Sequence, residues 1–150
     1  IVHRDAGTLV IDDFGSSPPK VSGSLKALRD DYPDAEITVV FEPNTGNRTP
    51  ESVETYEGAF DLSDKVIFPR FTRLPKSRDL VRFNEDELAS ALIKEFGQEI
   101  EVVKDDDELI KRLNEKLTQQ RQGKEGFKIV VFMGSHGFRG MIKQLVSLLE

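Results

Sequence analysis

Residues 10–19, Val-Ile-Asp-Asp-Phe-Gly-Ser-Ser-Pro-Pro, decide the fold of this chain. The apolar, β-branched run at residues 8–11 has the composition of a strand that is covered on both faces. Ser17 followed by Pro18 predicts a helix start, because serine caps a first turn and the fixed φ of proline suits it. The polar residues in between leave the carboxyl end of a strand, where open α/β sheets bind their ligands.

The composition is that of one ordinary globular domain covering residues 1–150, with 37% hydrophobic and 32% charged residues. A net charge of −6 argues against a general nucleic-acid binder, which would be basic. The chain has no cysteine, which excludes disulfides and thiolate metal sites and suits the cytoplasm. Neither a membrane-spanning run nor a signal peptide is visible, so we expect a cytoplasmic protein without a membrane partner. Because the chain begins at Ile1, we expect a fragment of a longer protein.

Predicted strands and helices alternate along the chain. Strands are expected at residues 8–11, 36–41, 65–68, 99–103 and 127–133, and helices at 18–31, from about 49, at 84–97, from about 105 and after 137. Residues 1–3 are expected to pair with 8–11 as a hairpin. Such alternation gives right-handed βαβ units. The fold class is therefore α/β: a Rossmann-like, three-layer domain with a mostly parallel sheet of five to six strands, helices on both faces and an N-terminal β-hairpin.

Unusual residues gather in loops that follow strands, namely residues 12–17, 42–48, 69–82 and 134–137. Because the carboxyl ends of parallel strands lie at one edge of a sheet, we expect these loops to form the functional face. No nucleophile with a paired base and no Walker-type loop accompanies them. The pattern therefore indicates half of a site, which closes on a ligand held elsewhere.

Each candidate site residue has a functional and a structural interpretation. Asp12 and Asp13 suit a ribose, a cation or a substrate ammonium, unless one of them satisfies the backbone donors of the turn. Arg48 suits a carboxylate or a phosphate, or else a surface ion pair. Residues 134–137, Gly-Ser-His-Gly, either offer amides to an anion or form a plain tight turn.

Two further features are interpreted as structural. The loop at 69–82 suits nucleotide phosphates or a partner surface, but we expect it to face solvent, as charged loops normally do. Its basic residues are Arg70, Arg73, Lys76, Arg78 and Arg82. His3 and His136 are far apart in the sequence, and nothing marks them as a metal pair. No metal site is expected in this chain.

Three segments, in the same order, resemble the C-terminal domain of the Mur ligase family. Residues 9–18 (LVIDDFGSSP) resemble the Asp-Asp-Tyr-(Gly/Ala)-His-His-Pro signature that opens this domain, with serines in place of both histidines and Phe14 in place of the tyrosine. Residues 39–49 (VVFEPNTGNRT) resemble its Phe-(Gln/Glu)-Pro motif, which precedes a loop ending in arginine. Residues 131–138 (VFMGSHGF) resemble its glycine-rich turn before the last helix. The resemblance covers essentially the whole chain and favours the alanine-adding and murein-peptide-recycling members.

The resemblance implies the third domain of an ATP-dependent, ADP-forming ligase of peptidoglycan synthesis or recycling. Such an enzyme joins an amino acid or peptide to a UDP-N-acetylmuramate-type carboxylate. The N-terminal and central domains of the same chain would be its partners, and the central domain would bind most of the ATP and magnesium. The implied domain has no catalytic residue and no metal ligand. Asp12 and Asp13 would contact ATP, and the amine pocket would be lined by Phe14, Ser16, Asn44, Asn47, Arg48, Gly134, Ser135, His136 and Phe138.

A second interpretation stays open beside this one. The chain would then be a free-standing, flavodoxin-like domain that binds a small anion or acts in regulation without catalysis. An upstream P-loop in the intact gene would favour the ligase, and its absence would favour the binding domain. The amine substrate, the oligomeric state and the extent of domain closure are not determined by the sequence.

Overall fold

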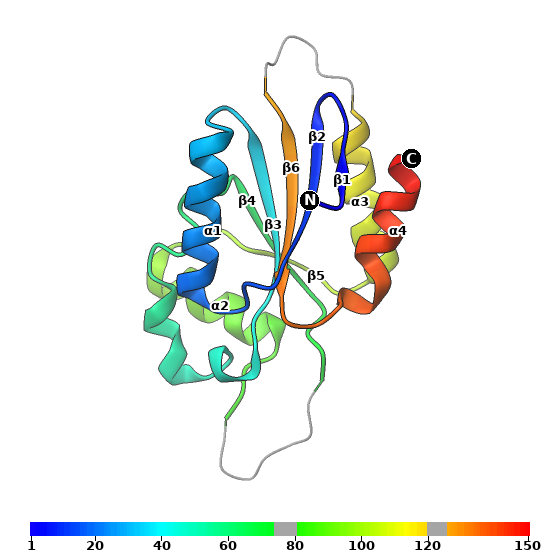
Figure 1. Cartoon of the computed structure of the whole chain (residues 1–150). Helices are drawn as coiled ribbons and strands as arrows, with labels where there is room; N and C mark the ends of the chain where they lie inside the picture. Colours follow the sequence, from blue (N-terminus) through cyan, green and yellow to red (C-terminus); the bar gives the residue numbers. More distant parts are fainter. Residues whose placement is uncertain (74–80, 120–125) are drawn as a thin grey trace.

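One sheet organises the computed structural model, which describes residues 1–73, 81–119 and 126–150 (Figure 1). Its strand order is β1-β2-β6-β3-β4-β5. The strands are β1 (His3–Arg4), β2 (Thr8–Asp13), β3 (Glu36–Glu42), β4 (Lys65–Pro69), β5 (Glu101–Val103) and β6 (Lys128–Gly134). β1 pairs antiparallel with β2, and every other neighbouring pair is parallel. The expected mostly parallel sheet and N-terminal hairpin are confirmed.

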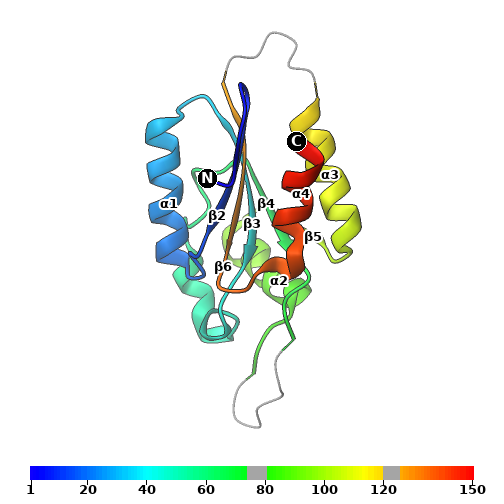
Figure 2. The same ribbon diagram turned by 45° about the vertical axis from the view of Figure 1, so that its right-hand side comes forward.

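Helices cover both faces of this sheet (Figure 2). They are α1 (Pro18–Asp31), α2 (Glu85–Phe96), α3 (Asp106–Thr118) and α4 (Met141–Leu149). α1 and α2 pack on one face together with the 3₁₀ segment η2 (Pro50–Tyr56), while α3 and α4 pack on the other. None of the helices in the described residues has the length and apolarity needed to cross a bilayer.

The side chains of the central strands belong to two separate cores, because they point alternately to the two faces of the sheet. In β6, Val131 and Met133 join the cluster beneath α1 and α2, whereas Val130 and Phe132 join the cluster beneath α3 and α4. All four side chains are 0% exposed. Full burial of each contributes about 1.5–3 kcal/mol relative to exposure, so β6 is a main source of stability.

Three predicted elements differ from the structure in their type or in their boundaries. The segment from Pro50 is a 3₁₀ helix rather than an α-helix. Its hydrogen bonds join residues three positions apart, such as the amide of Ser52 and the carbonyl oxygen of Thr49 (3.1 Å). β2 continues through residues 12–13, which stay paired with β6 instead of opening the loop. β5 begins at Glu101 rather than at residue 99.

Because of the connections between strands, the parallel strands all begin at one edge of the sheet and end at the other. α1 carries the chain from β2 past β6 to β3, and α3 returns it from β5 to β6 on the opposite face. β2, β6, β3 and β4 therefore all end at one edge, the lower edge in Figure 1. We call this the carboxyl edge, and the opposite one, where these strands begin, the amino edge. The reversal of strand order beside β6 is the place where such sheets bind ligands.

Candidate ligand-binding edge

The carboxyl edge brings together the three segments that carry the sequence motifs. The backbone amide of Asn44, after β3, donates to the carbonyl oxygen of Ser16, after β2, at 3.1 Å. β6 ends opposite β3, with Gly134 in register with Glu42. A Cβ atom at Gly134 would lie 3.0 Å from the carbonyl oxygen of Glu42 and 2.9 Å from Phe138 Cζ, so glycine is required for this close approach. The expected convergence of these loops is confirmed.

The end of β2 and the loop after it present two side chains to solvent and turn others inward. Phe14 is 76% exposed, and Asp12 is also exposed. Asp13 is half-buried, and its Oδ1 accepts a hydrogen bond from the Gly15 amide at 2.7 Å, which is the structural interpretation given for one of the two acids. Ser16 is buried, and its Oγ lies 3.4 Å from the Asn44 Nδ2 that donates to it. Asp12 at the end of β2 and Phe14 in the loop are therefore the residues that are exposed to a partner.

Arg48 is turned into the protein rather than toward solvent. It is 4% exposed, and its Nε donates to the carbonyl oxygen of Pro43 at 2.9 Å. Its Nη1 donates to the carbonyl oxygen of Thr72 at 2.9 Å, and its Nη2 to Oε1 of Glu42 at 3.3 Å. The guanidinium also lies over the Phe71 ring, 4.8 Å from the centroid. Because Glu42 is 0% exposed, the ion pair is buried, which differs from the surface pair that the sequence left open.

Burial sets the electrostatics around Arg48. Desolvation lowers the pKa of Arg48, and the Glu42 carboxylate opposes that shift. Burial also raises the pKa of Tyr56, whose hydroxyl donates to the carbonyl oxygen of Asn47 at 2.7 Å. Asn44 and Asn47 are half-buried and joined by a hydrogen bond of 2.5 Å from Nδ2 to Oδ1. This loop is thus a polar wall built over a buried charge pair.

The turn after β6 divides its residues between the surface and the core. Ser135 is exposed and His136 is half-buried, so both are accessible at the edge. Phe138 is 1% exposed and packs against Phe132, with ring centroids 5.3 Å apart. Its ring belongs to the core beneath α3 and α4, so in this conformation it is not the pocket wall that the resemblance implied.

Sequence reasoning missed an ion pair at the same edge. Nε and Nη2 of Arg139 donate to the two carboxylate oxygens of Asp106, each at 2.7 Å. Nη2 of Arg70 lies 3.6 Å from Asp106 Oδ2. The hydrogen bonds from Arg139 hold the pKa of Asp106 below its usual range. The only sequence signal was the acidic run before α3, which predicts a helix start and not this partner.

The structure shows the exposure of most basic residues of the loop at 69–82 and the contact made by His3. Arg70 and Arg73 are exposed, as expected, and Arg82 is half-buried. Lys76 and Arg78 lie outside the described residues. His3 Nε2 lies 3.2 Å from an oxygen of its near neighbour Asp5. The described ranges contain no group of three or more His, Cys, Asp or Glu side chains that could hold a metal ion.

The chain is thus a doubly wound α/β sheet with polar loops gathered at its carboxyl edge, which is the edge where such sheets bind ligands. The family model described as "Mur ligase, glutamate ligase domain" matches residues 1–136 of the chain. The chain therefore belongs to the Mur ligase family, of which it has the C-terminal domain.

Individual relatives agree with this assignment. UDP-N-acetylmuramate–L-alanine ligase of Chlorobium phaeobacteroides is 32% identical over 133 residues, which are 88% of this chain and 27% of that protein. A murein peptide ligase of Psychrobacter arcticus superposes with a TM-score of 0.70 at 20% identity, over 95% of this chain and 27% of that one. UDP-N-acetylmuramate–alanine ligase of Thermotoga maritima gives a TM-score of 0.65 at 18% identity, over 98% and 28%. The two structures show a shared fold, and the chain spans about a quarter of the length of these relatives.

Proposed function

We propose that this chain is the amine-binding third domain of an ATP-dependent, ADP-forming amide ligase of peptidoglycan synthesis or recycling. The observation that carries the proposal is the meeting of the three family motifs at the carboxyl edge, where Asn44 bonds to Ser16 and Gly134 adjoins Glu42. The relatives named above are ligases of UDP-N-acetylmuramate and of murein peptide. The N-terminal and central domains would complete the site from the other side.

The proposed reaction joins a UDP-N-acetylmuramate-type carboxylate to the amine of an amino acid or peptide. ATP, with magnesium, supplies the phosphoryl group that turns this carboxylate into an acyl phosphate. The amine attacks the acyl carbon, the C–N bond forms, and the bond to phosphate breaks, so that an amide, phosphate and ADP are released. Because water also attacks an acyl phosphate, this domain would close over the site before the amine reacts.

The residues of the carboxyl edge take specific parts in this proposal. Exposed Asp12, with Asp13 beside it, suits the ribose hydroxyls of ATP, because a carboxylate accepts their hydrogen bonds. Arg48 brings positive charge toward the carboxylate of the amine substrate. Direct contact requires its guanidinium to exchange one of its present acceptors. The pocket walls are Phe14, Ser16, Asn44, Asn47, Gly134, Ser135 and His136, with Phe138 packed beneath them.

Magnesium and most of the ATP would be held by the central domain. This domain's own contribution is to bind and orient the amine and to exclude water. It is inactive by itself in this proposal.

The test is ADP release by the full-length protein, supplied with UDP-N-acetylmuramate and a panel of amino acids and murein peptides. We expect release that depends on one class of amine. The variant Phe14→Ala removes an exposed ring, so it should fold normally and raise the KM for the amine about tenfold, the equivalent of about 1.4 kcal/mol.

The matched control is Leu62→Ala, since Leu62 is also an exposed apolar side chain (40%) but belongs to the amino edge. It should leave the KM unchanged. Absence of ADP release with every amine would contradict the proposal and leave the free-standing binding domain as the interpretation.

A further inference from the structure

A buried charge pair holds the backbone at Thr72, shortly after β4, and the backbone of Arg48 holds Phe83, shortly before α2. The backbone amide of Thr72 donates to Oε1 of Glu42, and the carbonyl oxygen of Thr72 accepts from Arg48 Nη1 at 2.9 Å. The carbonyl oxygen of Arg48 accepts from the amide of Phe83 at 2.5 Å. Glu42 and Arg48 therefore hold residues 72 and 83, which lie 11 positions apart in the chain, at the same point of the carboxyl edge.

Burial of the Glu42 carboxylate at this position costs desolvation free energy. Its side chain is 0% exposed, and Arg48 is the cation that pairs with it. Its second oxygen, Oε2, is buried and has no hydrogen-bond partner among the described residues. Buried ion pairs can often be replaced by apolar residues without loss of stability. Stability alone is therefore a poor explanation for a carboxylate at the end of a central strand.

What the carboxylate does provide is a fixed geometry. Its Oε1 bonds to a guanidinium nitrogen and a backbone amide at the same time. A second acid, Glu85, holds the neighbouring amide of Phe71 at 3.2 Å. The Phe71 ring in turn lies beneath the Arg48 guanidinium. Arg48 is thus constrained from two sides, and the backbone of residues 71–72 is fixed beside the loop that carries Asn44.

We propose that Glu42 is a positioning residue of the ligand site, which fixes Arg48 and the backbone at Thr72 without touching the ligand itself. The catalytic consequence rests on the proposed function, because it concerns the binding of the amine. The structural part is independent of it. Loss of the carboxylate would let the guanidinium and the backbone at residues 71–72 move away from the edge.

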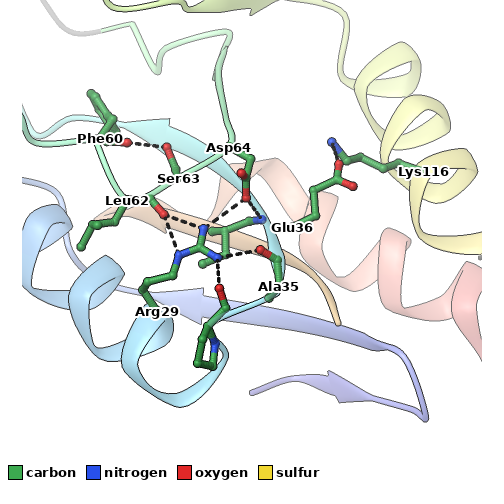
Figure 3. Close-up of polar contacts among 10 residues, drawn as sticks. Arg29, Ala35, Glu36, Phe60, Leu62, Ser63, Asp64 and Lys116 are labelled. Carbon is green, nitrogen blue, oxygen red and sulfur yellow. Dashed lines mark hydrogen bonds and ion pairs between the residues drawn. The ribbon is translucent and has the colours of Figure 1, made fainter. Parts of the chain in front are cut away.

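The amino edge supplies a matched control for this arrangement. Oδ2 of Asp64 accepts from Arg29 Nη2 at 3.2 Å (Figure 3). The same oxygen accepts from the Ile37 backbone amide at 2.7 Å, so it too joins an arginine to an amide. The side chain of Asp64 is 50% exposed and lies at the edge that the motifs avoid. Asp64→Ala therefore removes the same kinds of contact without affecting the proposed site.

Amine titrations of the full-length protein form the first test. Glu42→Ala is expected to raise the KM for the amine at least tenfold and to leave the KM for ATP within twofold. Glu42→Gln keeps an oxygen that accepts from Thr72 and Arg48, so it should restore most of the binding. Asp64→Ala should leave both KM values unchanged. A merely structural role predicts instead a lower kcat with unchanged KM, because part of the enzyme would be unfolded.

Hydrogen exchange of the same proteins, resolved at the amide of Thr72, forms the second test and needs no substrate. Glu42→Ala should speed this exchange at least tenfold, and Asp64→Ala should not. If Glu42→Ala does not fold, Thr72→Pro replaces it, since proline removes the amide donor and leaves both charges in place. It should raise the amine KM at least fivefold.

Unchanged amine KM in a folded Glu42→Ala or Thr72→Pro protein would overturn the proposal. So would an equal rise in Asp64→Ala, or Thr72 exchange that is the same with and without the carboxylate. If the wild-type protein releases no ADP, the proposed ligase function fails, and the exchange rates alone decide whether Glu42 positions this segment.

Discussion

Both edges of the sheet carry an arginine bound to a carboxylate, but the two pairs differ in exposure. At the amino edge, Arg29 reaches from α1 to the carbonyl oxygens of Leu62 and Ala35 and to Asp64 (Figure 3). The side chains of Arg29 and Asp64 are 24% and 50% exposed. At the carboxyl edge the corresponding values for Arg48 and Glu42 are 4% and 0%. Arg29 of the first pair satisfies carbonyl oxygens of the loops before β3 and β4, whereas the second pair joins the loop after β3 to the backbone after β4.

The difference shows that a hollow surface alone does not identify the ligand site. The amino edge has an open groove of about 660 Å³ between the starts of β4 and β5 and the end of α2, with Lys65, Phe96 and Glu101 in its lining. Lys65 there is paired with Glu101 at 2.8 Å. None of the three family motifs reaches this groove. The convergence of motifs, and not the volume, singles out the carboxyl edge.

The largest expected difference between the edges is the effect of removing the buried cation. Arg48→Ala leaves the Glu42 carboxylate buried without a counter-ion, so we expect a loss of about 3–5 kcal/mol in the free energy of unfolding. Urea denaturation followed by circular dichroism measures it. A loss below about 1 kcal/mol would mean that the pair is not buried in solution, and the contrast with the amino edge would disappear.

The next effect tests the packing of the carboxyl edge. Gly134→Ala places a Cβ 2.9 Å from Phe138 Cζ, and the ring cannot yield easily because it is 1% exposed. We expect a loss of about 1–3 kcal/mol by denaturation. Gly137 is the control, since its φ is −76° and a Cβ there meets nothing within 4 Å. Gly137→Ala should be neutral within about 0.5 kcal/mol, and equal losses in both variants would refute the close contact.

A smaller effect is expected for the exposed arginine. Arg29→Ala removes hydrogen bonds to solvent-accessible carbonyls and one exposed ion pair, so we expect a loss of about 1 kcal/mol. Raising the salt concentration to 1 M should reduce this loss, because exposed charges are screened, and should leave the effect of Arg48→Ala nearly unchanged. The same salt response for both variants would contradict the difference in burial.

The smallest effects concern acid stability. Hydrogen bonds from Arg139 at the carboxyl edge lower the pKa of Asp106 from 3.8, and a hydrogen bond from Lys65 lowers that of Glu101 from 4.5. Each carboxylate stabilises the fold above its unfolded pKa, and the contribution is lost as the pH falls through the lower, folded pKa. Asp106→Asn should therefore flatten the stability curve below about pH 3.8, and Glu101→Gln below about pH 4.5. Unfolding free energies measured from pH 2 to 6 would contradict this if either curve kept the wild-type slope.

Much of the fold follows from local patterns in the sequence. The β-branched runs predict the central strands, and the helix predicted at 84–97 corresponds to α2 with Asn84 and Gly97 as its capping residues. Parallel strands then place the loops at one edge without knowledge of any long-range contact. The 3₁₀ form of η2 was not predictable, since it depends on packing that buries Tyr56 and brings its hydroxyl to Asn47.

The orientation of site side chains was less predictable for a physical reason. Arg48 is turned inward by partners from two other parts of the chain, Glu42 and Thr72, and no local pattern reveals them. Phe138 packs into the core against Phe132, and residues 138 and 139 both have φ of 52° there, a conformation that non-glycine residues seldom adopt. Such features are set by tertiary contacts, and the structure is needed to find them.

The most direct test of the central claim is hydrogen exchange of the full-length protein with and without its ligands, an ATP analogue together with the amine. We predict that ligands slow exchange in residues 12–17, 42–48 and 134–138 at the carboxyl edge and leave residues 61–66 and 97–101 at the amino edge unchanged. Protection confined to the amino edge would contradict the assignment of the ligand-binding edge.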